Sequence, residues 1–331
     1  MSEFWKGLPV LVTGAGGFIG SHLAEALVGE GARVCAFVRY NSRGDPGLLR
    51  LLSPELRAKI ELVPGDLRDS AAVTEAARGC TVVFHLGALI SIPYSYRHPA
   101  EVAETNFIGT LNVLMASREL GVQRLLHASS SEVYGTARRV PIDESHPLQG
   151  QSPYSASKIG ADKLAESFFC TYGLPVVIGR PFNTYGPRQS ARAVIPTIIT
   201  QALVNSRIHL GNLETVRDFT YVSDTVAGFL SAAEAKGVEG KVYNLGTGEE
   251  VRIGDLVDQI SGQLGQPVEV VSDPERLRPR NSEVMRLVSD NSLARHDLGW
   301  SPAVRLGEGL GRTIPWIREH LDLYRPGQYE F

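Results

Sequence analysis

The amino-acid sequence predicts an α/β protein: a doubly wound parallel sheet with a smaller α/β domain in the C-terminal half. Three observations support this fold class. Short, nearly continuous apolar runs alternate with longer segments of helical periodicity, as in parallel sheets covered on both faces. A glycine-rich turn joins the first apolar run to the first helical segment. The chain has 331 residues, 43% of them hydrophobic, which is enough for two domains.

The predicted elements follow in order along the chain. The expected strands of the first half are residues 8–13, 33–39, 60–64, 82–86 and 123–129. The expected helices between and after them are residues 20–30, 71–79, 100–120 and 154–172. Beyond these we expect a strand over 174–180, regular segments over 220–234 and 242–245, and a helix over 253–264.

The glycine turn predicts a dinucleotide cofactor. Gly14, Gly17 and Gly20 have the spacing G-x-x-G-x-x-G, and Phe18 and Ile19, between the last two glycines, are also expected to contact the cofactor. Glycines let the backbone approach a pyrophosphate, and the helix N-terminus offers the anion free N–H groups. Glycines also occur in ordinary turns, but the strand–turn–helix context favours NAD or NADP.

The end of the second strand bears on which dinucleotide is bound. No acidic residue follows this strand until Asp45, whereas Arg39 and Arg43 could hold a 2′-phosphate, which favours NADP. The alternative is that both arginines are solvated loop residues. Asp66 ends the third strand and either accepts a bond from the adenine amino group or is a plain turn residue.

A possible reactive pair lies on the helix predicted over 154–172. Tyr154 and Lys158 are four residues apart, so both project from one face of that helix. An ammonium beside a phenol favours the phenolate, which makes Tyr154 a candidate base for an alcohol proton. The serine-rich segment 129–135 follows the fifth strand, at the sheet edge where ligands bind in such folds.

Taken together, these motifs resemble those of one family. They are the glycine turn, Asp66, His85-Leu-Gly-Ala88, Asn106, Ser130, Tyr154/Lys158, Arg180-Pro-Phe-Asn-Thr-Tyr-Gly-Pro187, Arg217-Asp-Phe219 and Arg278-Pro279. The chain resembles the extended short-chain dehydrogenases/reductases of the nucleotide-sugar epimerase/dehydratase family, which have a Rossmann fold.

The resemblance implies roles for individual residues. Ser130 would hydrogen-bond the reacting hydroxyl beside Tyr154, and Asn106 would steady the active-site helix. Further cofactor contacts are implied for Leu67, Leu86, Ala88 and Pro181. The helices over 100–120 and 154–172 resemble those that pair in the family's dimers, so a homodimer is expected.

The resemblance also implies how the domains divide. Residues 1–180, with a return segment at about 219–247, would bind the dinucleotide. Residues 181–218 and 248–331 would bind a nucleotide sugar.

The two residues after Ser130 distinguish activities within the family. Its 4,6-dehydratases carry a glutamate there, and this chain has Ser131-Glu132. Oxidation at C4 acidifies the C5–H, which Glu132 would remove while the C6 hydroxyl leaves as water. Hydride returning to C6 then gives a 4-keto-6-deoxy sugar, and the recycled cofactor stays bound. Ser131 stands where related enzymes have an acidic Asp, so the leaving-group proton would pass through Glu132 or a water. The alternative is that Glu132 is a surface or capping glutamate.

The substrate site is expected in the second half of the chain. Arg217, Arg278 and Asn183 resemble the family's diphosphate grip, since arginine binds phosphate oxygens bidentately. Arg192 and Val194 are expected on the nucleotide side, and Ser91 and Tyr94 at the sugar. Segments 141–154 and 186–196 are most similar to dehydratases of the legionaminic-acid pathway type, which act on GDP- or UDP-linked N-acetylglucosamine.

Four rival functions remain open. A C4 epimerase shares Ser130, Tyr154 and Lys158 but needs no Glu132. A nucleotide-linked uronic acid decarboxylase and a 5,6-dehydratase belong to the same family. A non-catalytic dinucleotide sensor is not expected to keep both Tyr154 and Lys158.

Composition excludes several other classes. A net charge of −3 offers no basic surface for nucleic acid. Cys35, Cys80 and Cys170 fit no metal or redox spacing, so no metal is expected and all three are predicted core residues. No apolar run is long enough for a membrane span, and the first is too short for a signal peptide. We therefore expect a cytoplasmic protein without a membrane partner.

Overall fold

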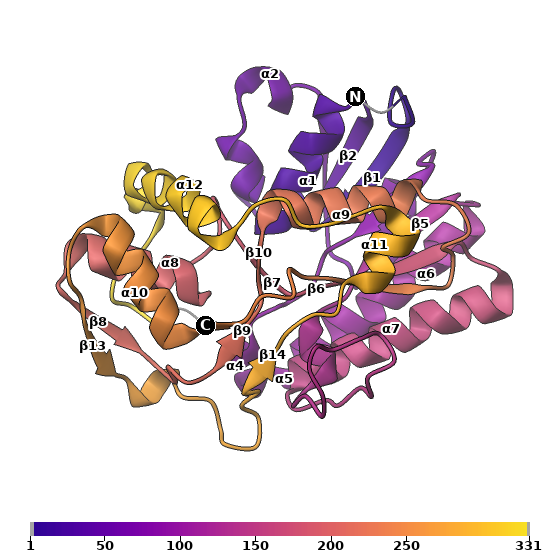
Figure 1. Cartoon of the computed structure of the whole chain (residues 1–331). Coiled ribbons are helices and arrows are strands. Elements are labelled where there is room, and N and C mark those ends of the chain that lie inside the picture. The colour runs from indigo at the N-terminus through magenta and orange to yellow at the C-terminus, as the bar shows by residue number, and fades with distance from the viewer. Residues whose placement is uncertain (1–2, 330–331) are drawn as a thin grey trace.

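The computed structural model describes residues 3–329. Its main element is a seven-stranded parallel sheet with the order β11-β6-β5-β4-β1-β2-β3 (Figure 1). The strands are β1 (Pro9–Thr13), β2 (Arg33–Arg39), β3 (Ile60–Gly65), β4 (Val82–His85), β5 (Arg124–Ala128), β6 (Val176–Pro181) and β11 (Val242–Leu245). The predicted doubly wound α/β fold is confirmed.

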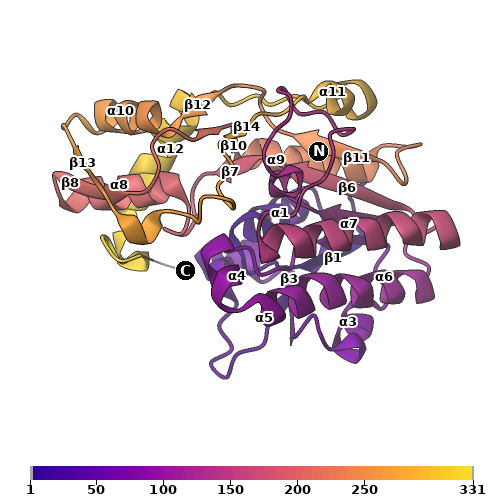
Figure 2. The same cartoon turned by 90° about the horizontal axis from the view of Figure 1, so that it is seen from below.

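Helices cover both faces of this sheet. α1 (Phe18–Gly29) and α9 (Val222–Glu234) pack on one face. The other face carries α3 (Ser70–Ala77), α6 (Gly109–Glu119) and α7 (Pro153–Tyr172), which lie together in Figure 2. Successive strand residues point to opposite faces, so Val10 and Val12 join the first core and Leu11 the second. This two-sided burial explains the continuous apolar runs of the sequence.

The strand order reverses between β1 and β4. From β1 the chain builds β2 and β3 on one side of the sheet, and then returns to build β4, β5 and β6 on the other. In open α/β sheets ligands bind at this reversal, beyond the carboxyl ends of the strands. The topology therefore fixes where the site should lie.

Segments from the C-terminal half form a second lobe, on the left of Figure 1. Its helices are α8 (Val194–Val204), α10 (Ile253–Leu264) and α12 (Leu306–Glu319). Parallel strands β8 (Arg207–Leu210) and β13 (Glu269–Ser272) form one small sheet. The other small sheets contain β7 (Asn183–Tyr185), β9 (Val216–Arg217), β10 (Phe219–Tyr221), β12 (Val251–Arg252) and β14 (Arg286–Leu287). The shorter helices of the chain are α2 (Pro54–Arg57), α4 (Ile92–Arg97), α5 (Pro99–Ala103) and α11 (Ser292–Leu298).

Two predictions are corrected. The helix expected over 100–120 is α5 and α6 joined by a π-helical turn at Glu104–Ile108. This wider turn contains Asn106, whose buried side chain bonds to the loop after β4 and to α7. Cys170, expected in the core, is exposed on α7, whereas Cys35 is buried and Cys80 half-buried.

Across residues 3–329 no helix combines the length and hydropathy needed to cross a membrane.

Candidate active site

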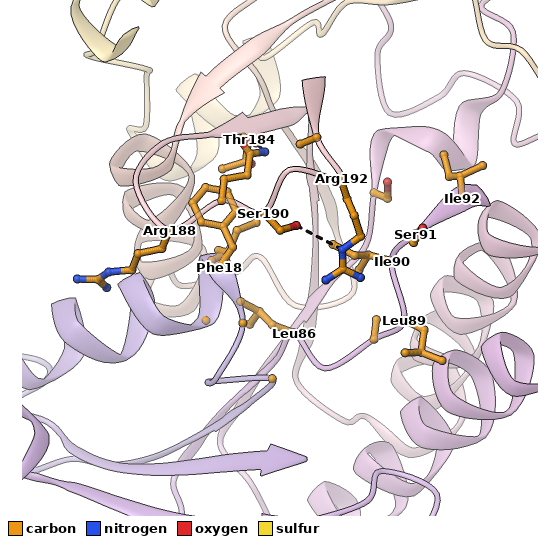
Figure 3. Close-up of a pocket in the computed structure, with 18 of the residues that line it drawn as sticks. Phe18, Leu86, Leu89, Ile90, Ser91, Ile92, Thr184, Arg188, Ser190 and Arg192 are labelled. Carbon is orange, nitrogen blue, oxygen red and sulfur yellow. Dashed lines mark hydrogen bonds between the residues drawn. The ribbon is translucent and has the colours of Figure 1, made fainter. Parts of the chain in front are cut away.

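One large cavity, of about 1360 Å³, lies where the strand order reverses. It extends from the glycine turn after β1, past the ends of β4, β5 and β6, to α8 and the 276–283 segment of the second lobe. Figure 3 shows part of its lining, including Phe18, Leu86 and Ser91. With one exception, every residue predicted to bind or react lines this cavity.

The glycine turn is packed too closely for side chains at two of its glycines. Gly14 has φ +70°, and a Cβ there would lie 2.8 Å from the backbone of Gly87. A Cβ on Gly20 would lie 2.2 Å from the carbonyl oxygen of Gly14. Gly17 caps α1 without a side-chain bond, so the N-terminus of the helix remains available to an anion. These residues, with Phe18 and Ile19 beside them, fit the pyrophosphate of a dinucleotide.

The adenosine end of the cavity is lined by Arg39, Asp66 and Leu67. The Asp66 carboxylate accepts a 2.7 Å bond from Arg68, and this bond lowers the pKa of Asp66 to about 2. Arg39 lies 3.6 Å from Glu101, with 70% of its side chain exposed. The cavity is also lined by the remaining predicted cofactor contacts. Leu86 and Ala88 follow β4, and Pro181 is the last residue of β6.

The predicted catalytic residues come from two neighbouring elements. Ser130 follows β5 and caps a short 3₁₀ turn, Ser131–Tyr134, by accepting the Glu132 N–H at 3.2 Å. Tyr154 and Lys158 lie in the first turns of α7, which begins with Pro153 and a capping box at Ser152. All five residues, Ser130, Ser131, Glu132, Tyr154 and Lys158, line the same cavity.

The protonation expected of Tyr154 needs a correction. Burial raises the pKa of the Tyr154 phenol to about 12, although its bond with Ser130 acts in the opposite direction. The Lys158 ammonium donates a 2.7 Å bond to the carbonyl of Ala128, and burial lowers its pKa to about 8. Burial disfavours both charged forms and so opposes the attraction between ammonium and phenolate on which the expectation relied; the positive charge of a bound oxidised nicotinamide would favour the phenolate again.

Glu132 belongs to a cluster of charged side chains deep in the cavity. Its Oε1 lies 3.5 Å from Arg278 Nη1, and 14% of its side chain is exposed. Glu283 Oε1 lies 3.8 Å from Arg217 Nη2 and 4.0 Å from Arg278 Nη1. The two arginines predicted to grip a diphosphate are thus adjacent to each other and face two carboxylates. The sequence analysis missed Glu283; a carboxylate five residues after Arg278 was the available signal.

The other substrate residues divide between cavity and framework. Asn183, Arg192, Val194 and Ser91 line the cavity. The Asn183 Oδ1 is buried without a hydrogen-bond partner, and Arg192 Nε donates to Ser190 (Figure 3). Tyr94 is the exception, because its hydroxyl donates a 2.5 Å bond to Glu101 on α5 and its ring packs on His98. Tyr94 therefore braces α4 and does not line the cavity.

Known proteins with related sequences or structures define the family. A family model described as GDP-mannose 4,6 dehydratase matches residues 11–313. A UDP-glucose 4-epimerase of Mycolicibacterium smegmatis is 35% identical over 93% of this chain and 98% of its own length. A dTDP-glucose 4,6-dehydratase of Streptomyces griseus is 34% identical over 96% of each chain. The crystal structure of the dTDP-glucose 4,6-dehydratase DesIV from Streptomyces venezuelae, solved with NAD bound, superposes with a TM-score of 0.86. It is 31% identical, over 96% of this chain and 99% of its own.

The fold, the cofactor cradle and the tyrosine–lysine pair define an extended short-chain dehydrogenase/reductase. Within that class, the chain belongs to the NAD(P)-dependent nucleotide-sugar dehydratase and epimerase family. The resemblance found in the sequence motifs is thereby confirmed.

Proposed function

We propose that this protein is a nucleotide-sugar 4,6-dehydratase, which converts its hexose into a 4-keto-6-deoxy sugar. The observation that carries this proposal is the presence of Glu132 in the same cavity as Ser130, Tyr154 and Lys158. An epimerase needs a base for the C4 hydroxyl alone, whereas a dehydratase needs a second group for the C5 proton.

Each of these side chains has a separate task in the proposed reaction. Ser130 and Tyr154 hold the C4 hydroxyl, and Tyr154 accepts its proton as the phenolate, which the Lys158 ammonium and the charge of a bound oxidised nicotinamide would favour. When bound, the nicotinamide would supply hydride chemistry, by accepting hydride from C4 and returning it at C6. Glu132 removes the proton from C5, and the C6 hydroxyl leaves as water after receiving a proton. Ser131 is too weak an acid to give that proton, so Glu132 or a water provides it.

The direct test is to incubate the protein with UDP-, GDP-, dTDP- and CDP-hexoses and to analyse the products by mass spectrometry. We expect one nucleotide sugar to lose the mass of one water and to gain a carbonyl. An isomeric product of unchanged mass would contradict the dehydratase proposal and support an epimerase.

The C4 epimerase is the second candidate, and a specific observation favours it. The relative at 35% identity is a UDP-glucose 4-epimerase, a higher identity than that of the Streptomyces griseus dehydratase. The uronic acid decarboxylase and the 5,6-dehydratase remain alternatives, which need two additions to the test. Loss of carbon dioxide from a nucleotide-linked uronic acid indicates the first. The unsaturated sugar of the second has the same mass as the 4-keto product and is recognised by its vinyl protons in the NMR spectrum.

We propose GDP- or UDP-linked N-acetylglucosamine as the substrate. The resemblance of segments 141–154 and 186–196 to dehydratases of the legionaminic-acid pathway type supports this. The cavity also has an apolar wall of Leu89, Ile90 and Ile92, against which an acetamido methyl group could pack. Equal turnover of the corresponding glucose and N-acetylglucosamine nucleotides would contradict this choice.

We also propose that NADP is the preferred cofactor. Arg39 and Arg43 both line the adenosine end of the cavity, and an arginine pair suits a 2′-phosphate. Titration of the purified protein with both dinucleotides tests this proposal. Tighter binding of NAD would contradict it.

We further propose a homodimer formed through α6 and α7. Ile108, Met115 and Tyr172, on or beside these helices, leave 40%, 45% and 52% of their surfaces exposed. Light scattering of the purified protein should give twice the chain mass of 35.9 kDa. A monomer would contradict the proposal.

A further inference from the structure

A buried carboxylate that the proposed reaction does not use lies behind Lys158. Asp162 follows Lys158 by one helical turn on α7 and is 1% exposed. Both of its bonds from Arg180 go to one oxygen, Oδ2, at 2.9 and 3.1 Å. The other oxygen, Oδ1, has no hydrogen bond of normal geometry and lies 3.4 Å from His127 Nε2. The carboxylate thus also has His127 and the Ser129 hydroxyl as neighbours, but Oδ1 has no hydrogen bond of normal geometry.

Arg180 alone does not explain this arrangement. An ion pair isolated from water is costly unless all its polar atoms are satisfied. Neutral His127 does not balance the charge of Asp162: burial, followed by the charge of Lys158, lowers the pKa of His127 to about 4. Burial raises the pKa of Asp162, but the proximity of His127, the charge of Arg180 and the Ser129 hydroxyl lower it to about 2, so Asp162 is ionised. Lys158 lies one helical turn earlier on α7, where the charge of Asp162 acts on its ammonium.

Lys158 in turn depends on a counter-charge. Its side chain is buried, and its one hydrogen bond of normal geometry goes to the neutral carbonyl of Ala128. Burial lowers the pKa of Lys158 to about 8, and the charge of Asp162 opposes that shift. Without Asp162 the pKa of Lys158 would therefore be lower still.

We propose that Asp162 is a positioning residue for the Tyr154–Lys158 pair, whose carboxylate keeps the buried Lys158 ammonium charged behind the reacting phenol. The proposal rests on the role assigned to Lys158 in the proposed function. Arg180 holds the carboxylate in place through Oδ2 and is itself fixed by a 2.9 Å bond to the Tyr134 hydroxyl. The ionised carboxylate is thereby fixed one helical turn from Lys158.

Other titratable groups surround Lys158 on each element packed against it. They are His85 on β4, His127 on β5, Arg180 on β6, and Tyr154 and Asp162 on α7 itself. Burial lowers the pKa values of both histidines, which leaves them neutral, and Arg180 is positive. Among these groups Asp162 is the one that can favour the ammonium.

The test is to titrate Lys158 directly, without substrate. Lysine ¹³Cε NMR follows the ammonium, and the Lys158 signal is assigned by its loss in Lys158→Met. In Asp162→Asn we expect the titration midpoint of Lys158 to fall by about one pH unit, because an opposite charge one helical turn away is removed. The alkaline limb of the pH profile of kcat/KM should shift to lower pH by a similar amount. In Asp162→Glu the Lys158 midpoint and the alkaline limb should both return to their wild-type positions.

Two further variants keep the proposal falsifiable. Asp162→Asn leaves the Arg180 guanidinium without its carboxylate partner. The double variant D162N/R180Q removes both charges and is therefore titrated as well. We expect the Lys158 midpoint to fall in this variant too. Asp224→Asn is the control, because Asp224 is also a buried carboxylate but bonds to the backbone N–H groups of Ala303 and Val304. It should leave the Lys158 midpoint unchanged.

An unchanged Lys158 midpoint in folded Asp162→Asn or in folded D162N/R180Q, or an equal fall in Asp224→Asn, would overturn the proposal. The NMR titration needs no turnover. The titration result can therefore be interpreted even if the protein is not a dehydratase.

Discussion

At the scale of single residues, Glu132 distinguishes the proposed dehydratase from a C4 epimerase. Glu132→Gln keeps the shape of the side chain but removes the base for the C5 proton. We expect it to bind cofactor and nucleotide sugar as the wild type does, and to lose at least about a hundredfold in kcat. Because the neutral side chain no longer competes for Arg278, nucleoside diphosphates should bind as tightly as before or tighter. Calorimetry and product assays measure the two effects, and undiminished turnover would remove Glu132 from the mechanism.

Lys158 should show a conflict between activity and stability. Its folded pKa, about 8, lies below the ordinary value of 10.5, so folding disfavours the ammonium at neutral pH. This cost is fully present below about pH 8 and disappears as the pH rises towards the unfolded pKa. Lys158→Met should therefore abolish turnover yet raise the free energy of unfolding by about 2 kcal/mol at neutral pH.

Urea unfolding at neutral pH and near pH 10 measures this effect. The gain from Lys158→Met should shrink at the higher pH. A destabilised Lys158→Met at neutral pH would show that the bond to Ala128 outweighs the cost of burying the charge.

Much of the candidate site was predictable at this scale, since residues that follow successive parallel strands meet at one edge. Ser130 after β5 and the glycine turn after β1 are examples. Tyr94 was not, because the sequence gives no sign of the bond to Glu101 that turns it aside. Glu283 was missed because its proximity to Arg217 depends on the packing of distant loops.

At the scale of elements, the turn into α1 should tolerate no side chain at Gly20. In Gly20→Ala the added methyl would meet the Gly14 carbonyl, so the turn must shift. We expect a loss of about 2 kcal/mol in unfolding free energy and at least tenfold weaker dinucleotide binding.

Gly29→Ala is the matched control on the same helix. A methyl group there meets open space, so we expect a small stabilisation, about 0.5 kcal/mol, and unchanged cofactor affinity. Thermal unfolding and fluorescence titration of the two variants check both expectations. If both variants had the same stability and the same dinucleotide affinity, the glycine turn would not be the binding site of the pyrophosphate.

Elements with a clear hydrophobic pattern, such as β2 and α7, were predicted to within one residue of their observed bounds. The π turn at Glu104–Ile108 was not, because its wider winding is stabilised by tertiary bonds of Asn106 and leaves no periodic signal. α8 was also missed: its sequence, VIPTIITQALV, contains proline and β-branched residues, and burial in the second lobe overrides their weak helix propensity.

At the scale of the whole molecule, the cavity is lined from both lobes. A dinucleotide and a nucleotide sugar should each raise the melting temperature, and together they should raise it further, since each binds the native state. Differential scanning fluorimetry measures this. Mutually exclusive stabilisation would contradict a cavity that holds both ligands. The expected domain division at residues 180, 219 and 247 stays a prediction, as does a cytoplasmic location.

The most direct measurement of the central claim is turnover in D₂O with the accepted nucleotide sugar. If Glu132 removes the C5 proton during loss of water, the product must regain a proton at C5 from the solvent. From the wild type we predict a 4-keto-6-deoxy sugar with one deuterium at C5. From Glu132→Gln we predict no such product. A wild-type product that retains its oxygen at C6 and carries no deuterium at C5 would contradict the account.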